Sequence, residues 1–149
     1  MLNLALVRPA LEYGSVTWHP LNSTLTNRLE ATQRFACRVI LQSWNLSHED
    51  LLQETNLQPL NKRRDVASLC HLYKMFSNLC ASPNPFKPHP KPDLRNLNSR
   101  AVLIPRHRLT LTQRFFYPYS SSLWNYLPEA IVNANTIQSF KSCVKTHLL

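Results

Sequence analysis

The fold is decided first by residues 11–40, which read LEYGSVTWHPLNSTLTNRLEATQRFACRVI. The beginning of this stretch ends an apolar helix expected over residues 2–13, which Pro9 would kink or end early. Gly14 is the only glycine in the chain, and it suits the turn after this helix because glycine adopts positive φ without strain. A second, longer helix follows, so the chain begins as helix, turn and helix.

The second helix is amphipathic and has either Ser23 or Thr24 as its expected N-cap. Its apolar stripe consists of Leu25, Leu29, Ala36, Val39 and Ile40, with Phe35 at the edge. A stripe of this kind usually faces a protein core. Thr32 interrupts the stripe, and its hydroxyl can bond to a carbonyl of the preceding turn. Arg34 and Arg38 point elsewhere, either to solvent or to a phosphate group.

Two further helices are expected in the middle of the chain. Ser47 opens a capping-box variant, SHED, that starts a short helix ending near Thr55. Pro59 fits the first turn of the next helix. The apolar face of that helix holds Val66, Leu69, Cys70, Tyr73 and Phe76.

The last third of the chain predicts two more helices. Residues 115–127 should be helical despite Pro118, and Thr136 should cap a final helix. The inward-facing residues are Phe115, Tyr119, Leu123, Trp124 and Leu127 in the first of these helices and Ile137, Phe140 and Val144 in the second. Residues 109–112 alternate as in a short strand. A mainly α fold of five or six helices is therefore predicted.

A proline-rich segment divides the chain. Residues 82–92, SPNPFKPHPKP, contain five of the eleven prolines, so we expect an extended polyproline-II linker rather than a helix. Docking of this segment to a proline-recognising domain is the less favoured alternative. The predicted architecture is short helices in two lobes joined by a Pro-rich linker, with a helical segment at 1–81, a basic linker at 82–99 and a C-terminal helical segment at 100–149.

The net charge of +9 is concentrated in about one third of the chain. From Lys62 to Arg114 there are eleven basic residues against Asp65 and Asp93, and the basic and acidic residues elsewhere cancel. A local positive field of this kind favours a polyanionic partner, and nucleic acid is the commonest one. A solvated basic loop without a partner is the alternative.

The predicted contacts to an RNA or DNA backbone are basic side chains of this region and of the second helix. They are Lys62, Arg63, Arg64, Arg100, Arg106, Arg108, Arg34 and Arg38. The first three lie at a helix start, where cations oppose the helix macrodipole and where a phosphate binds well. The sequence therefore predicts a phosphate site at that helix start.

Catalytic chemistry is not indicated. A polymerase needs a carboxylate cluster that holds two metal ions, whereas the three aspartates, Asp50, Asp65 and Asp93, are dispersed along the chain. No nucleophile elbow, Walker loop or zinc-protease motif is present, and the four cysteines lack metal-ligand spacing. We expect no independent enzymatic activity, no metal, no cofactor and no small-molecule substrate.

The N-terminal apolar run and the cysteines indicate the cellular compartment of the protein. The apolar run at residues 1–7 is too short to span a bilayer, so no membrane association is expected. Widely spaced cysteines without a signal peptide predict free, mostly buried thiols in a reducing compartment. An intracellular protein, nuclear or cytoplasmic, is expected.

A series of short motifs carries a family resemblance. The motifs are Leu11-Glu12-Tyr13-Gly14 with Trp18 and Pro20, Leu29-Glu30 with Gln33 and Arg38, Leu57 with Leu60, Arg63 and Arg64, Tyr73-Lys74, Leu123-Trp124-Asn125 with Leu127-Pro128, and Phe140-Lys141. In this order and spacing they resemble the region downstream of the polymerase domain in reverse transcriptases of non-LTR (LINE-type, jockey-like) retrotransposons. The resemblance covers nearly the whole chain.

The resemblance implies a fragment of an RNA-directed DNA polymerase that lacks the catalytic palm. Residues 1–81 would correspond to a thumb-like segment after the palm, and the chain would help to grip a template–primer duplex or element RNA. An upstream polymerase domain is the implied partner, on which the apolar first helix would pack. The alternative is a non-catalytic helical interaction protein or a non-functional remnant.

Overall fold

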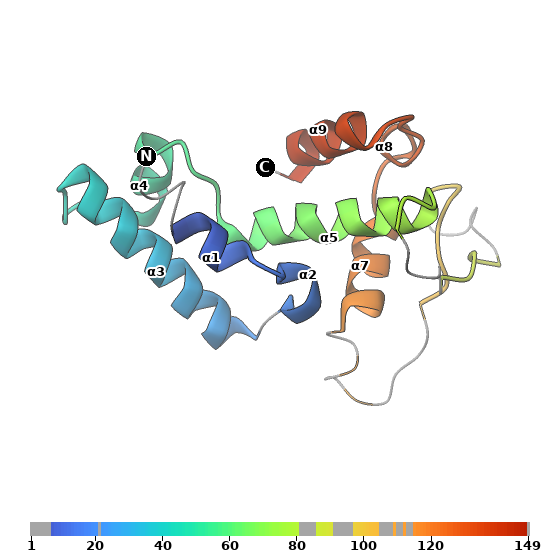
Figure 1. Cartoon of the computed structure of the whole chain (residues 1–149), viewed down its shortest axis with the longest axis horizontal. Coiled ribbons are helices and arrows are strands. Elements are labelled where there is room, and N and C mark those ends of the chain that lie inside the picture. The colour runs from blue at the N-terminus through green and yellow to red at the C-terminus, as the bar shows by residue number, and fades with distance from the viewer. Residues whose placement is uncertain are drawn as a thin grey trace.

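The computed structural model describes residues 7–20, 22–80, 86–90, 97–104, 109, 112 and 115–148. Within these ranges the chain forms eight helices and no sheet, so the prediction of a mainly α fold is confirmed. Three of the helices have only four or five residues, which explains why the sequence pattern predicted fewer. The central helix, α5 (Leu60–Phe76), runs through the middle of the molecule, with the other helices around it (Figure 1).

Two short helices precede the first long one. α1 (Arg8–Glu12) carries Pro9 in its first turn, where the missing N–H removes no helical hydrogen bond. Residues 2–6 of the predicted helix lie outside the described residues, so the expected kink or early end at this proline is not tested. Gly14 takes the left-handed conformation at φ 59° before α2 (Ser15–Trp18), which confirms the predicted turn.

The long helix α3 (Ser23–Leu41) is capped by Asn22, whose side chain accepts a hydrogen bond from the N–H of Leu25 at 2.8 Å. The predicted caps, Ser23 and Thr24, both lie inside the helix, so that prediction was wrong by one or two residues. Asparagine is as good an N-cap as serine or threonine, and propensity alone does not separate the neighbouring candidates.

The helices on either side of the next turn begin close to where they were predicted. Ser47 caps α4 (His48–Glu54) in a capping box with Asp50, as predicted. The serine Oγ accepts from the Asp50 N–H at 3.2 Å, and the Ser47 N–H donates back to Oδ2 of Asp50 at 3.3 Å. Pro59 is the N-cap of α5 rather than a first-turn residue, one position away from the prediction.

Three helices complete the fold. α7 (Phe116–Asn125) contains Pro118 in its first turn and continues through it. α8 (Glu129–Val132) is a single turn that was not predicted. α9 (Ile137–Leu148) is capped by Thr136 as predicted, because its hydroxyl accepts from the Ser139 N–H at 3.2 Å.

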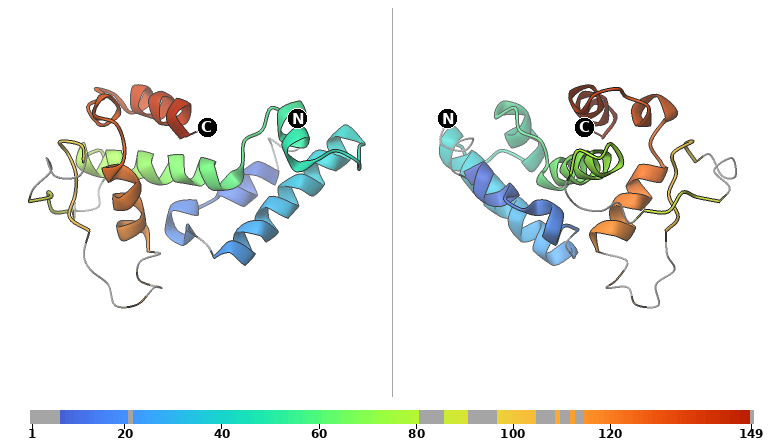
Figure 2. Two further views of the ribbon diagram at one scale, coloured as in Figure 1. Left: turned by 180° about the vertical axis from the view of Figure 1, so that it is seen from behind. Right: turned by 45° about the vertical axis from the view of Figure 1, so that its right-hand side comes forward.

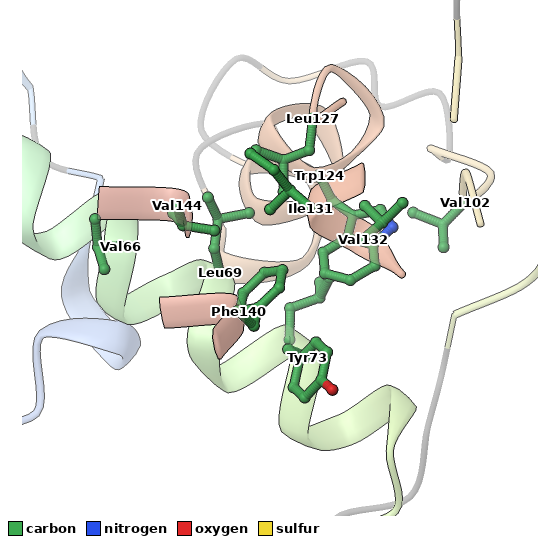
Figure 3. Packing of buried hydrophobic residues seen from close by; sticks show 11 residues of the cluster. Val66, Leu69, Tyr73, Val102, Trp124, Leu127, Ile131, Val132, Phe140 and Val144 are labelled. Carbon is green, nitrogen blue, oxygen red and sulfur yellow. The ribbon is translucent and has the colours of Figure 1, made fainter. Parts of the chain in front are cut away.

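The hydrophobic core lies where α7, α8 and α9 meet α5 (Figure 3). Its buried members are Val66, Leu69, Leu72, Tyr73, Val102, Trp124, Leu127, Ile131, Val132, Phe140 and Val144. Tyr73 stacks on Phe140 with ring centroids 4.5 Å apart, and its hydroxyl donates to the Ala134 carbonyl at 2.7 Å. This core joins α5, from the predicted 1–81 segment, to helices of the predicted 100–149 segment. Phe115 was expected inside but is 56% exposed.

The predicted apolar stripe of α3 is mostly exposed rather than buried in the core, although Leu29 and Ala36 are half-buried. Leu25, Phe35, Val39 and Ile40 are all exposed, and the buried residues of this helix are Gln33 and Cys37. The Gln33 amide donates to the Gln58 carbonyl at 3.1 Å, so a polar contact fixes the inward face. The interruption at Thr32 is as predicted, since its hydroxyl donates to the Arg28 carbonyl at 3.1 Å.

The start of α8 and the end of α7 hold the last residues of the predicted linker and the residues that follow it. The Asn125 side chain donates to the Val102 carbonyl and accepts from the Val102 N–H, both at 2.8 Å. Trp124 Nε1 donates to the Arg100 carbonyl at 3.0 Å, and the buried Asn98 amide donates to the Trp124 carbonyl at 2.7 Å. The Leu-Trp-Asn motif therefore has a structural role as a clamp on residues 98–102.

Candidate nucleic-acid interface

The basic residues predicted at the start of α5 differ in their surroundings. Arg63 forms an ion pair with Glu12 of α1, and both side chains are mostly buried. Arg64 is only 1% exposed. Lys62 is half-buried, and its backbone N–H donates to the Asn61 side chain at 2.8 Å. The helix start is therefore not an exposed row of three cations.

The guanidinium of Arg64 is enclosed by the fold. It lies 4.9 Å from the centre of the Trp18 ring, a cation–π arrangement between α5 and α2. Burial lowers its pKa, and the negative charges of Glu30, Glu12 and Asp65 oppose that shift. Among the described residues, none of its side-chain nitrogens has a hydrogen-bond partner. The charge of Arg64 is thus partly balanced by nearby carboxylates and is little exposed to solvent.

Polar side chains from α3 also occupy the region before α5. Oε1 of Glu30 accepts from the Asn61 N–H at 3.1 Å, which satisfies one of the free donors at the start of the helix. Glu30 and Gln33 of α3, with Glu12 and Trp18 upstream, are all residues of the motifs that resemble the reverse transcriptase region. Each of them contacts α5 or the residues just before it, so these motifs hold the N-terminal helices to α5.

The other predicted contacts are dispersed. Arg100 is exposed, and its guanidinium donates at 3.1 Å to the carbonyl of Val132, the last residue of α8. Arg34 and Arg38 are half-exposed on α3. Arg106 and Arg108 lie outside the described residues. The eight predicted residues are therefore not brought together on one described surface.

A groove gathers a different set of cations. It has a volume of about 940 Å³ and runs along α5, between α9 on one side and residues 12–16 and 56–58 on the other. Its basic lining residues are Arg63, Arg64, His71, Lys74, Lys141 and Lys145. Glu12, which is paired with Arg63, is the only acidic residue among those that line it. The groove is therefore a cationic concavity.

Three lysine ammonium groups give the groove its accessible charge. Lys74 of α5 and Lys141 and Lys145 of α9 are all exposed. Lys141 and Lys145 are four residues apart, so they share one face of α9. The half-buried Cys70 thiol lies among these lysines. Burial raises the pKa of Cys70, while the charges of Lys141, Lys74 and Lys145 act to lower it.

His71 adds a titratable group to the groove wall. Burial lowers the pKa of His71, and the nearby Lys74 lowers it further. The ring of His71 meets that of Phe116 edge-on, with centroids 5.4 Å apart. An anion bound in the groove would oppose both effects, because it favours the charged imidazolium.

Sequence reasoning missed His71, Lys141 and Lys145. The two α9 lysines lie outside the strongly basic third of the chain, in a part where the charges cancel. The signal that could have found them is their spacing of four residues on an amphipathic helix, where they flank the apolar row of Phe140 and Val144. Nothing in the sequence shows that this face lies beside Lys74.

The described aspartates have structural partners. Oδ1 of Asp65 accepts from the Tyr119 hydroxyl at 2.7 Å and lies 2.8 Å from Nε2 of His19. This arrangement joins α2, α5 and α7 at a half-buried site. Burial and the hydrogen bond to Asp65 raise the pKa of Tyr119. Asp50 belongs to the capping box of α4, and Asp93 lies outside the described residues.

The four cysteines have free thiols. None of the four cysteines is in a disulfide; only Cys37 is fully buried, so the expectation of mostly buried thiols was wrong for the exposed Cys143. Within the described ranges, no three metal-binding side chains cluster. No helix there has the length and apolar character needed to cross a membrane. No protein-family model, curated protein or solved structure matches this chain.

Proposed function

We propose that this chain binds RNA or DNA through the phosphate backbone, with the groove between α5 and α9 as the binding surface. The observation that supports the proposal is the gathering of Lys74, Lys141 and Lys145 around one concavity whose only acidic lining residue is already paired. Three like charges on adjacent helices repel one another, and a bound polyanion removes that repulsion.

The chemistry of the groove favours backbone contacts over base recognition. Lysine ammonium groups are flexible point charges that neutralise phosphates without reading sequence. Arg63 and Arg64 contribute less than their charge suggests, because the first is paired with Glu12 and the second is enclosed beside Trp18. Binding should therefore be salt-dependent and weakly selective between sequences.

We also propose the origin implied by the resemblance, a segment downstream of the polymerase domain in a non-LTR retrotransposon reverse transcriptase. Support comes from the positions of the motif residues, several of which form the contacts that hold α1, α2 and α3 to α5. Binding rather than polymerisation is assigned to the chain itself, because Asp50 is engaged in a helix cap and Asp65 in a half-buried hydrogen-bond cluster.

The test is the salt dependence of nucleic-acid binding by a variant with Lys74→Gln, Lys141→Gln and Lys145→Gln. The dissociation constant for a short single-stranded RNA is measured over a range of salt concentrations. Each lost phosphate contact should reduce the slope of log K against log salt by about 0.7 for a single strand. The triple variant should therefore bind more weakly and show a slope reduced by about 2 units.

A matched control removes the same net charge elsewhere. Arg28→Gln, Lys62→Gln and Lys87→Gln replace three cations that do not line the groove. This control should retain most of the parent slope. Equal losses in the two triple variants would mean that only net charge matters, and the groove would then not be the binding surface. The parent protein failing to bind RNA or duplex DNA at low salt would refute the function itself.

A further inference from the structure

The outer face of α3 is an exposed apolar surface. Its members are Leu25, Phe35, Val39 and Ile40 of the helix and Trp44 just after it, with exposed fractions from 42% to 59%. Phe35 and Trp44 pack edge-on with ring centroids 6.0 Å apart, so they form one aromatic ridge. We refer to these five residues as the α3 outer face. Large apolar residues that cluster in this way mark an interaction surface more often than isolated exposed ones.

The position of α3 in the fold leaves this face uncovered by the other helices. α3 lies at the edge of the molecule in each view, and its opposite side faces α4 and α5 (Figures 1 and 2). The helix has 19 residues and is therefore about 28 Å long. Phe35 and Val39 are four residues apart, a spacing that matches the side-chain rows that a second helix packs against.

Apart from Glu30, the charged residues of α3 are all positive. Arg28, Arg34 and Arg38 belong to the same helix, and none of them forms an ion pair with a described residue. Glu30 is the only acidic residue of α3, and its side chain is turned inward to the Asn61 N–H. A partner that covers the apolar row therefore meets unpaired guanidinium groups and no carboxylate from α3.

This charge pattern decides between the possible occupants. Two copies of the chain would bring the arginines of one α3 against those of the other at such an interface. An acidic partner would instead pair with the same arginines, and guanidinium groups suit bidentate contacts to carboxylates. We propose that the α3 outer face binds an amphipathic helix of a different protein, whose apolar row is flanked by Asp or Glu.

This interface is separate from the α5–α9 groove, so the proposal does not rest on the proposed function. The partner helix lies along α3 with anchors at i, i+3, i+4 and i+7 spacing. Its apolar side chains cover Phe35, Val39 and Leu25. Its acidic row pairs with Arg28, Arg34 and Arg38, which sets the orientation of the two helices.

The test begins with a phage-displayed library of amphipathic helices as the probe. The apolar positions are fixed as Leu, and the flanking positions are randomised among Glu, Gln and Lys. Selection on the purified chain should enrich Glu at the flanking positions. A synthetic peptide of the enriched sequence should bind at least tenfold more tightly than the same peptide with Lys at those positions. Recovery of Gln-rich or Lys-rich helices, or of none, would overturn the proposal.

Point variants then locate the site. Phe35→Ser with Val39→Ser should weaken peptide binding at least tenfold, whereas Tyr126→Ser, at an exposed aromatic residue far along the chain, should leave it unchanged. All three residues are exposed, so helicity and melting temperature should not change. Arg28→Glu with Arg34→Glu should reverse the preference between the Glu and Lys peptides, an effect that loss of folding cannot produce.

The same variants test the other occupants. If Phe35→Ser with Val39→Ser abolishes self-association, binding to anionic phospholipid vesicles or binding to RNA, the face serves that partner and the acidic-helix proposal is wrong. We expect the chain to be monomeric and its RNA binding to be unaffected by these substitutions. Loss of RNA binding in the Lys74, Lys141 and Lys145 variant, with peptide binding intact, separates the two surfaces.

Discussion

Replacement of Asn125 by Ala should strongly destabilise the fold. The Asn125 amide serves both backbone groups of Val102, donating to the carbonyl and accepting from the N–H, each at 2.8 Å. Asn125 and Val102 are 4% and 2% exposed, so water does not replace the lost partner. The variant leaves two buried backbone groups unsatisfied.

The expected loss in the free energy of unfolding can be estimated from those two backbone groups. Each unsatisfied buried donor or acceptor costs about 1–3 kcal/mol, which gives about 2–6 kcal/mol for the pair. A domain of this size has a total stability of about 5–15 kcal/mol, so the variant should be close to unfolding. Asn125→Asp should also destabilise near neutral pH, because a carboxylate accepts from the Val102 N–H but cannot donate to the Val102 carbonyl.

Equilibrium unfolding in urea, followed by circular dichroism at 222 nm and by tryptophan fluorescence, measures the effect. Tyr126→Ala is the matched control at the next position, where the side chain is 77% exposed, and it should change stability by less than about 0.5 kcal/mol. If Asn125→Ala and Tyr126→Ala have the same midpoint and slope, the side chain does not clamp residues 98–102 and the role given to the Leu-Trp-Asn motif is wrong.

Two titrations give the remaining predictions. An NMR titration should show a pKa of His71 below the usual value for histidine. Because the unfolded chain then binds more protons than the folded chain, this group makes the fold less stable as the pH falls through the usual histidine range. RNA bound in the groove should raise the pKa of His71. Tyr119 should remain protonated at a pH where a free tyrosine side chain ionises, and Tyr119→Phe should lower stability by about 1–2 kcal/mol because Asp65 loses a donor. A pKa of His71 or of Tyr119 at the ordinary value for that residue type would contradict these expectations.

Helix boundaries depend on contacts between residues close together in the chain, so they could be predicted from the sequence. The cap at Ser47, the cap at Thr136 and the turn at Gly14 involve contacts within a few residues, and all three occur as predicted. The mainly α class follows from the same local patterns. Errors of one or two residues, as at Asn22 and Pro59, arise where neighbouring residues are almost equally good at a helix start.

The sequence predicted less well which side of each helix becomes buried. The apolar row of α3 predicted an inward face, yet that helix buries Gln33 and Cys37. The Gln33 side chain donates a hydrogen bond to the carbonyl of Gln58, 25 residues away in the chain. A local sequence pattern does not predict a partner at that distance. Hydrophobic periodicity shows that a helix has an apolar face, but it does not say whether this chain or another molecule covers it.

At the candidate site, too, local features could be predicted from the sequence and long-range contacts could not. The sequence by itself determined a mainly α chain with an excess of positive charge. Only the tertiary structure decided which charges meet: it encloses Arg64 beside Trp18, pairs Arg63 with Glu12, and brings Lys141 and Lys145 to Lys74. The physical reason is range, because capping and helical propensity act within one turn, whereas burial and electrostatic fields depend on groups that are distant in the chain and adjacent in space.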